Sequence, residues 1–225
     1  MLPVRPKGAF AWRRRAPLAV LLALGIGLPA CAGSGYTYVS SATTRTYFRV
    51  PSSWKLFTKQ QLLVAANLED SPQAATSFPF LAGYDADPDP SIQHILGGIP
   101  QFPVVMAEVQ KLSPTGHDQF SVQSIRNAVY AVDQLLQQDA ADILSYKEVV
   151  VSGGYHGIRM VYNLSLAGNL NVVEGNQVMR VNQVGLVDPA ASLLYLLVIR
   201  CSAECYKHNQ TAINQVSSSF TVRAH

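Results

Sequence analysis

The stretch that decides the fold is residues 147–201, KEVVVSGGYHGIRMVYNLSLAGNLNVVEGNQVMRVNQVGLVDPAASLLYLLVIRC. It contains four runs rich in β-branched and aromatic residues, over 147–152, 156–166, 177–187 and 193–201. Short connections containing Gly-Gly, Gly-Asn or Asp-Pro separate these runs. Because antiparallel strands need only short links, whereas parallel strands need long crossovers, the spacing predicts an antiparallel meander.

Helical patterns flank this block on both sides. Before it, a helix is expected over 121–139, with Ser121 as its N-cap and apolar residues along one face. After it, the sequence predicts a helix over 203–217 and a short strand over 219–222. Helices that precede and follow a block of antiparallel strands, rather than alternating with its strands, predict an α+β fold.

The N-terminal part has a weaker pattern because prolines divide it into short pieces. Thr58 is expected to cap a helix over 59–67, whose apolar residues share one face. Strands are expected over 46–50, 54–57, 78–84 and 103–110.

The first thirty residues have the layout of a signal peptide. Their five charges are all basic, and the run over 16–30 carries none. A helix of that length spans about 22 Å, less than a hydrocarbon core of about 30 Å, so a permanent membrane span is not expected. The run ends in Leu28-Pro29-Ala30-Cys31, which resembles the lipobox of bacterial lipoproteins. In those proteins the cysteine is acylated, for example with palmitate, and becomes the new N-terminus.

The alternative is an ordinary secreted protein that is cleaved after Ala30, with Cys31 a bystander. The count of cysteines favours the lipid anchor. If Cys201 and Cys205 pair with each other, Cys31 is left as a free thiol in an oxidising compartment, and acylation removes that thiol. The route of export, general secretory or twin-arginine, stays open.

The boundaries that follow are a lipoprotein signal peptide over 1–30, a flexible tether over 31–44 and a folded domain over 45–225. The tether is expected because its residues are mostly Gly, Ser, Thr and Tyr. Removing the leader takes away five of the 17 basic residues and none of the 14 acidic ones, which leaves a net charge of −2. No basic excess remains for binding nucleic acid. With 48% hydrophobic and 14% charged residues, the remainder is expected to form a core.

Cys201 and Cys205 lie at the end of an expected strand and in the first turn of the following helix. In an exported protein a structural disulfide is the default for such a pair, worth about 2 kcal/mol in the chain-entropy model. A redox-active pair is the alternative, although such pairs usually have only two residues between the cysteines.

Three carboxylates alternate in Asp85-Ala86-Asp87-Pro88-Asp89, as they do at the start of a calcium loop. The pattern then fails, because Pro90 stands where glycine makes the turn and Leu96 stands where a bidentate glutamate belongs. A solvated acidic loop is therefore expected, with weak extracellular calcium binding as the alternative.

Signatures of catalysis are absent from the sequence. The five histidines have no metal-ligand spacing, and no Gly-x-Ser-x-Gly elbow or phosphate-binding glycine loop occurs. We therefore expect no metal, no cofactor and no enzymatic activity.

Several segments resemble the PsbP-like domain of actinobacterial cell-envelope lipoproteins. They are YFRVPSSW at 47–54, with its Val-Pro-x-x-Trp entry into a first hairpin, GYHGIR at 154–159, YLLVIRCSAECY at 195–206 and SSSFTV at 217–222. The resemblance implies an α-β-α sandwich around a central antiparallel sheet, and a binding or assembly module. Plant relatives dock onto a photosynthetic membrane complex, and some actinobacterial relatives handle envelope glycolipids; the photosynthetic role is not carried over.

The working hypothesis is a non-enzymatic lipoprotein on the extracytoplasmic face of the cell membrane that binds an envelope protein or glycolipid. The aromatic, irregular segment with Phe78, Phe80, Tyr84 and Phe102 is the expected place for a ligand pocket, unless these rings belong to the core. A glycolipid carrier predicts an apolar concavity there, and an assembly factor predicts a flat exposed patch. A secreted hydrolase or small-molecule-modifying enzyme, the remaining alternative, predicts a polar cleft.

Overall fold

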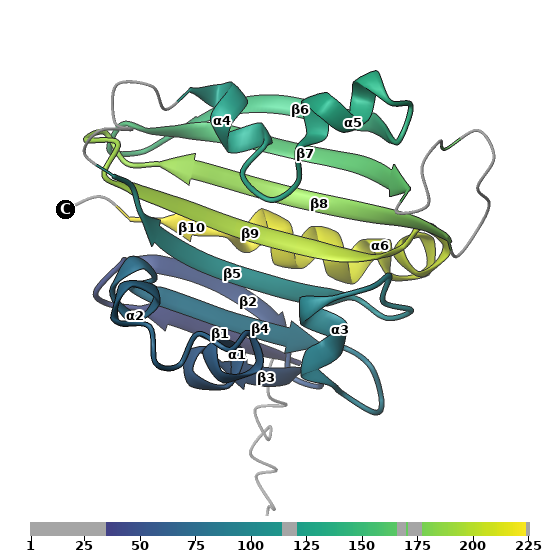
Figure 1. Cartoon of the computed structure of the whole chain (residues 1–225), viewed down its shortest axis with the longest axis horizontal. Helices are drawn as coiled ribbons and strands as arrows, with labels where there is room; N and C mark the ends of the chain where they lie inside the picture. Colours follow the sequence, from purple (N-terminus) through teal and green to yellow (C-terminus); the bar gives the residue numbers. More distant parts are fainter. Residues whose placement is uncertain (1–34, 114–120, 166–169, 171–176, 224–225) are drawn as a thin grey trace, which may run out of the picture. The chain divides into compact units, whose positions relative to one another are not determined.

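The computed structural model describes residues 35–113, 121–165, 170 and 177–223. A seven-stranded sheet forms its centre (Figure 1). Every neighbouring pair in the sheet is antiparallel. The strands, in their order across the sheet, are β3 (Lys55–Thr58), β4 (Phe80–Asp85), β5 (Val104–Lys111), β9 (Leu193–Ser202), β8 (Val178–Val187), β7 (Tyr155–Ser165) and β6 (Ala141–Val151). The expected meander is therefore confirmed as β6 to β9.

A second, three-stranded sheet joins the two ends of the domain. Its strands are β1 (Tyr36–Ser41), β2 (Thr46–Pro51) and β10 (Thr221–Val222). Strand β2 lies in the middle and pairs antiparallel with both neighbours. The first and last described strands thus meet on one partner.

The small sheet corrects two expectations. Residues 36–41 were expected to belong to a flexible tether over 31–44, but they form β1, because tyrosine, threonine and valine suit a strand once β2 offers a partner. The segments around Val50-Pro51 and Trp54 were expected to enter a hairpin. Instead, β2 and β3 belong to different sheets, so the chain crosses from one layer to the other between them.

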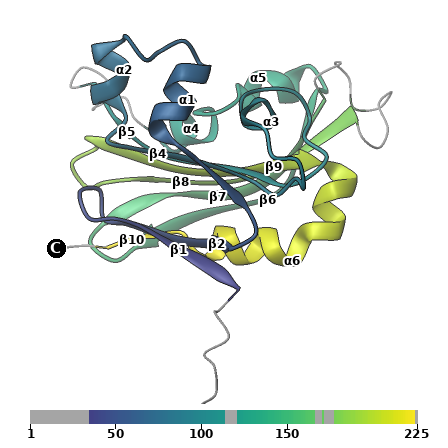
Figure 2. The same cartoon turned by 90° about the horizontal axis from the view of Figure 1, so that it is seen from below.

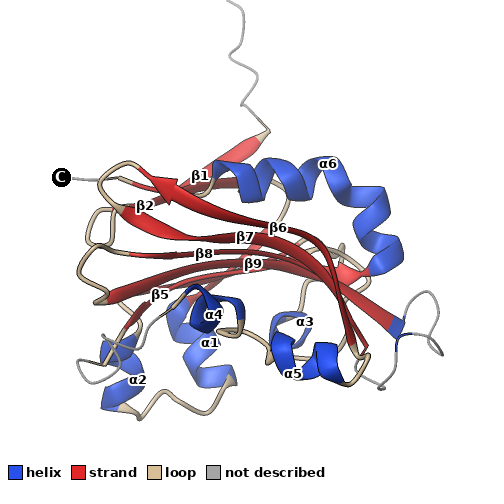
Figure 3. Cartoon of the chain, turned by 90° about the horizontal axis from the view of Figure 1, so that it is seen from above, coloured by secondary structure: helices blue, strands red, loops and turns tan. Residues whose placement is uncertain are grey.

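Helices cover both faces of the large sheet (Figure 2, Figure 3). One face carries five short helices, α1 (Lys59–Ala65), α2 (Pro72–Ser77), α3 (Ile92–Leu96), α4 (Val122–Arg126) and α5 (Val132–Gln137). The opposite face carries the long helix α6 (Ala203–Ser219) together with the small sheet. This arrangement confirms the α+β class and the sandwich around a central antiparallel sheet. No helix among the described residues is both long and apolar enough to cross a membrane.

The helix starts follow the capping residues of the sequence. Thr58 caps α1, as expected, and it forms a capping box with Gln61. The hydroxyl of Ser202 accepts a hydrogen bond from the backbone N–H of Cys205 at the start of α6. Both caps satisfy donors that a helix would otherwise leave unpaired.

The single helix expected over 121–139 is wrong, because the chain forms α4 and α5 with a break between them. The amide of Asn127 explains the break: its oxygen accepts from the backbone N–H of Asp133, and its nitrogen donates to the Asp133 carboxylate. Hydrogen bonds from Arg126 and then Asn127 lower the pKa of Asp133 to about 2. These side chains give the backbone an alternative to continuing the helix.

Two glycines let the short helices approach the sheet closely. A Cβ atom added at Gly185 of β8 would lie 2.3 Å from Cγ2 of Ile125, the buried residue of α4. A Cβ atom at Gly83 of β4 would lie 2.7 Å from Cδ1 of Ile95 in α3. The buried isoleucine of each helix therefore occupies the space that a side chain at the facing glycine would fill.

Candidate functional site

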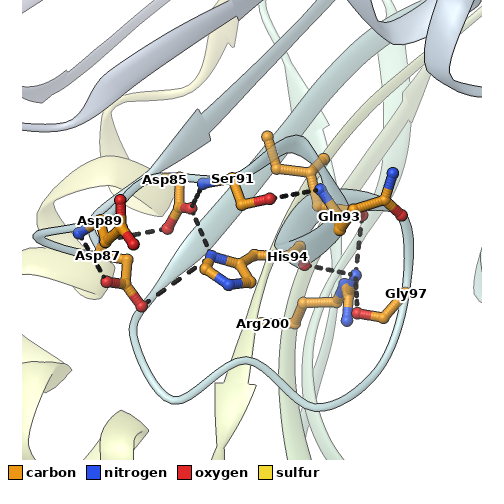
Figure 4. Close-up of polar contacts among 9 residues, drawn as sticks. Asp85, Asp87, Asp89, Ser91, Gln93, His94, Gly97 and Arg200 are labelled. Atoms are coloured by element: carbon orange, nitrogen blue, oxygen red, sulfur yellow. Dashed lines mark hydrogen bonds and ion pairs between the residues drawn. The ribbon is translucent and has the colours of Figure 1, made fainter.

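A buried carboxylate holds together the acidic loop after β4. Asp85 is the last residue of β4 and is 1% exposed. Its Oδ1 accepts from the N–H of Asp87 at 3.0 Å, and its Oδ2 accepts from the N–H of Ser91 at 2.9 Å (Figure 4). The Nδ1 atom of His94 lies 2.8 Å from the same Oδ2. The loop was expected to be solvated, and Asp85 corrects that expectation: its carboxylate faces inward because it supplies the acceptor for two backbone donors and one ring nitrogen.

The rest of the acidic loop is more open. Asp87 accepts from the N–H of Asp89 at 2.9 Å, and Asp89 is exposed. Within the part of the chain that the structure describes, no group of three or more His, Cys, Asp or Glu side chains could hold a metal ion. The alternating carboxylates thus serve the turn through Asx-type hydrogen bonds.

A histidine oriented by a carboxylate is also the base and orienting group of many hydrolases. A hydrolase needs a nucleophile beside the free ring nitrogen. The nearby hydroxyl of Ser91 instead accepts from the N–H of Gln93 and caps α3. No hydrogen bond joins His94 to a serine or cysteine among the described residues. The Asp85–His94 pair therefore holds the start of α3 in place.

Arg200 of β9 fastens the other end of α3. Its guanidinium donates to the carbonyl oxygens of Ile95 and Gly98, each at 2.8 Å. It also donates to the carbonyl oxygen of His94 at 3.1 Å (Figure 4). A cation at a helix C-terminus satisfies the last carbonyls and complements the helix dipole. Burial lowers the pKa of Arg200. Two residues of the large sheet, Asp85 and Arg200, therefore hold the short helix at both ends.

A cavity of about 200 Å³ lies beside α3. Its lining includes Leu96, Met106, Val129, Tyr130 and Arg200. Burial raises the pKa of Tyr130, while the charge of Arg200 acts in the opposite direction. Pockets for small organic ligands usually measure roughly 300–1,000 Å³, so this cavity is small for a lipid tail.

The aromatic pocket expected from the sequence is not formed. Phe80 and Tyr84 project from β4 toward the opposite face, where their rings lie 6.4 Å and 6.1 Å from that of Phe48. Tyr84 is 4% exposed, and burial raises its pKa to about 12. Phe78 is half-buried at the end of α2, and Phe102, in the loop before β5, is 39% exposed. Alternation along β4 sends two of the four rings into the core, and the loops separate the others.

Cys201 and Cys205 form a disulfide with their Cα atoms 5.9 Å apart. The bond joins the end of β9 to the first turn of α6. Both cysteines are buried, at 0% and 6% exposure. Thiol exchange requires an accessible sulfur, so burial favours the structural disulfide over the redox pair.

Glu108 is a half-buried acid in the middle of β5. It lies opposite Leu81 of β4 and Leu196 of β9, and its side chain faces the layer of short helices. Burial raises its pKa from 4.5 to about 7. Glu108 was not predicted as a notable residue, although it is the one acidic residue in the otherwise apolar run VVMAEV at 104–109.

The position of Glu108 predicts a pH-dependent stability. Between pH 4.5 and about 7 the folded state keeps a proton that the unfolded state releases, so the free energy of unfolding falls as the pH rises through this window. We expect Glu108→Gln to remove this slope, which amounts to at most about 3 kcal/mol across the window. Urea unfolding below and above the window measures it. Glu148→Gln, on the exposed edge strand β6, is the control and keeps the wild-type slope; equal slopes for wild type and Glu108→Gln would contradict the prediction.

The structure is an α+β domain. Its buried polar residues Asp85 and Arg200, together with His94, hold the short helix α3 in place. No protein-family model matches the sequence, and neither does any curated protein. Several solved structures are similar. The cyanobacterial PsbP of Synechocystis is 13% identical with a TM-score of 0.46, covering 87% of this chain and 99% of its own.

Two further structures show the same level of similarity. LpqN of Mycobacterium tuberculosis, described as involved in cell envelope biogenesis, is 15% identical with a TM-score of 0.45, covering 84% of this chain and 91% of its own. The Ran-binding protein Mog1p of Saccharomyces cerevisiae is 10% identical with a TM-score of 0.45, covering 83% and 95%. The three thus include a PsbP protein and a cell-envelope protein.

Proposed function

We propose that this chain is a lipoprotein of an actinobacterial type of cell envelope, anchored through Cys31 on the extracytoplasmic face of the cell membrane. Its domain binds another envelope component and catalyses no reaction. The observation that carries the proposal is the sequence Leu28-Pro29-Ala30-Cys31 at the end of a basic and then apolar leader.

The cysteines support the anchor. The chain has three, and the structure pairs Cys201 with Cys205, which leaves Cys31 outside the disulfide. An exported protein with one remaining cysteine directly after a small residue has a chemical use for it in acylation. The domain boundaries of 1–30 for the leader and 31 for the mature start form part of the same proposal.

The braced polar residues support a binding role. Asp85 and His94, the pair closest to a catalytic arrangement, are engaged in holding α3. The rings of Phe80 and Tyr84 are engaged in the core, and the cavity beside α3 is small. A larger hollow of about 450 Å³, lined in part by Arg45, Tyr155 and Tyr195, is open to the surface. We therefore propose contact through the surface, with an envelope protein or a glycolipid headgroup, in place of an enclosed acyl chain.

The anchor is tested by expressing the full chain and its Cys31→Ser variant in an actinobacterial host. We expect wild-type protein in the membrane fraction, with acyl groups on a peptide that begins at Cys31. The variant should lose all acylation, and Ser34→Ala is the matched control that keeps it. Intact mass before and after reduction also reports the disulfide. An unlipidated wild-type chain that starts at Cys31 or later would overturn the anchor.

The binding role is tested on the same membranes. Cross-linking followed by mass spectrometry, and lipid extraction of the purified lipoprotein, identify a protein or glycolipid partner respectively. Turnover of envelope esters or glycosides by wild type and its abolition in His94→Ala would contradict the non-enzymatic role.

A further inference from the structure

The outer face of the small sheet carries tyrosines and arginines. Residues that lie directly opposite each other in an antiparallel pair share a face, and Tyr38 of β1 lies opposite Arg49 of β2. Phe48 and Val50, the alternate residues of β2, point into the core. We use the name tyrosine-arginine face for the outward set, which consists of Tyr36, Tyr38, Tyr47, Arg49 and Arg223.

The cations of this face lie over its rings. The guanidinium carbon of Arg49 is 4.7 Å from the ring centroid of Tyr36, and that of Arg223 is 4.3 Å from that of Tyr47. Tyr38 is 69% exposed, and a shallow groove of about 240 Å³ runs between it and Arg223. Stacking holds the two guanidinium groups along the surface. Arg223 is exposed, whereas Arg49 is half-buried and its Nε atom is covered, so only its terminal nitrogens can face an anion.

Charge along the chain is segregated toward this face. Residues 31–68 contain four basic residues and residues 205–225 contain two, and neither segment contains an acidic residue. All 14 acidic residues lie over 69–204, where six basic residues accompany them. The first segment supplies β1 and β2 but also β3 and α1, where two of its basic residues, Lys55 and Lys59, lie. The second supplies β10 and most of α6. The small sheet, its flanking residues and α6 thus carry four basic residues, Arg45, Arg49, Lys207 and Arg223, against one acidic residue, Glu204.

The small sheet also begins close to the anchor. Four residues lie between Cys31 and Tyr36, and the five Cα–Cα steps limit the distance between their Cα atoms to about 18 Å. We propose that the tyrosine-arginine face lies on the membrane that holds the lipid, with its arginines on the anionic headgroups of phospholipids. This inference rests on the lipid anchor proposed above.

The side-chain chemistry favours a lipid surface over a protein partner. Tyrosine is enriched at the interface of membranes, where its ring is partly immersed and its hydroxyl stays in water. A basic residue near an anionic leaflet contributes about 1 kcal/mol to binding. A stable protein interface usually has a desolvated apolar anchor at its centre, whereas the centre of this face is a pair of stacked cations.

The test uses the full lipidated chain, purified and reconstituted into vesicles of phosphatidylcholine alone or mixed with phosphatidylglycerol. Hydroxyl-radical oxidation of Tyr38 reports whether the face is covered. We expect slower oxidation on the anionic vesicles, and loss of that protection in high salt. Because about 1 kcal/mol corresponds to about fivefold, the ratio of docked to undocked protein should fall about fivefold for each arginine in Arg49→Gln and Arg223→Gln.

A matched control removes two basic residues elsewhere. Lys111→Gln combined with Lys147→Gln changes the net charge equally at exposed positions on β5 and β6, and it should leave the protection intact. Oxidation of Tyr38 at the same rate on both vesicle types, with acyl groups present on Cys31, would overturn the docking and leave the anchor standing. An unacylated chain in the soluble fraction would overturn the anchor itself. Protection in native membranes but not in protein-free anionic vesicles would assign the face to a protein partner and overturn the lipid surface.

Discussion

Replacing Gly185 with alanine is expected to destabilise the domain by about 3 kcal/mol. The new Cβ atom would lie 2.3 Å from Cγ2 of Ile125 and 3.2 Å from Cδ2 of Leu196. Real Cβ atoms do not approach carbon this closely, and all three positions are in the dense core between α4 and the sheet. Helix α4 has only five residues, so we expect it to detach before the sheet deforms. Urea unfolding measures the loss, and hydrogen exchange locates it at α4.

Gly97→Ala is the matched control. Its backbone is extended, and a Cβ atom there would meet nothing closer than the Gln93 carbonyl oxygen at 3.9 Å. It should cost under about 0.5 kcal/mol. Ile125→Ala removes the obstructing methyl group, so the double variant with Gly185→Ala should be more stable than the sum of the two single losses indicates. Additive losses would contradict the steric account.

Removing the carboxylate of Asp85 is the second large perturbation. Asp85→Ala leaves the N–H groups of Asp87 and Ser91 and the ring nitrogen of His94 without their acceptor. A hydrogen bond to a charged group contributes about 1.5–3 kcal/mol to stability. Because Asp85→Ala removes an acceptor shared by three donors, we expect the free energy of unfolding to fall by about 3 kcal/mol. Thermal unfolding measures it, and faster hydrogen exchange should concentrate in α3.

Two variants show whether the hydrogen bonds are responsible. Asp85→Asn keeps one acceptor oxygen and should recover about half of the loss. Asp89→Ala removes an exposed carboxylate of the same loop and should change the stability by less than about 0.5 kcal/mol. A loss in Asp85→Ala no larger than that in Asp89→Ala would show that the loop closes without this carboxylate.

The sequence predicted the centre of the fold because its strands are covered on both faces. The expected runs 156–166, 177–187 and 193–201 match β7, β8 and β9 within one residue at each end. The run 147–152 covers only the second half of β6. Strand β6 is the edge of the sheet and most of its residues are exposed, so polar residues such as Asp142 and Ser145 hide its first half from a hydrophobic pattern.

The short helices and the small sheet depend on contacts distant in sequence. Helix α3 forms under the control of Asp85 and of Arg200, which lies more than a hundred residues away along the chain. Strand β10 forms because β2, near the start of the domain, is beside it. Neither partner is visible in a local window of sequence.

The site was predictable only in part. The pairing of Cys201 with Cys205 was predicted from their places at the end of a strand and the start of a helix, together with the expected export, and the structure confirms the pairing. The alternating carboxylates marked the loop, but not the inward turn of Asp85 or its bond to His94. The prediction of an aromatic pocket was wrong because Phe80 and Tyr84 point into the core. The number of aromatic residues in a segment does not show whether their rings line a pocket or pack in the core.

The order of strands in the small sheet determines when the domain can be completed. Strand β2 lies near the start of the domain, and its partner β10 holds the last residues of the fold. Helix α6, which packs on β2, also comes late. A chain that crosses a membrane from its N-terminus therefore has to deliver nearly all of its length before β2 gains both neighbours. If the chain is exported as proposed above, native closure is postponed until translocation is almost finished, and the emerging N-terminal half carries an unpaired, aromatic strand edge during that interval.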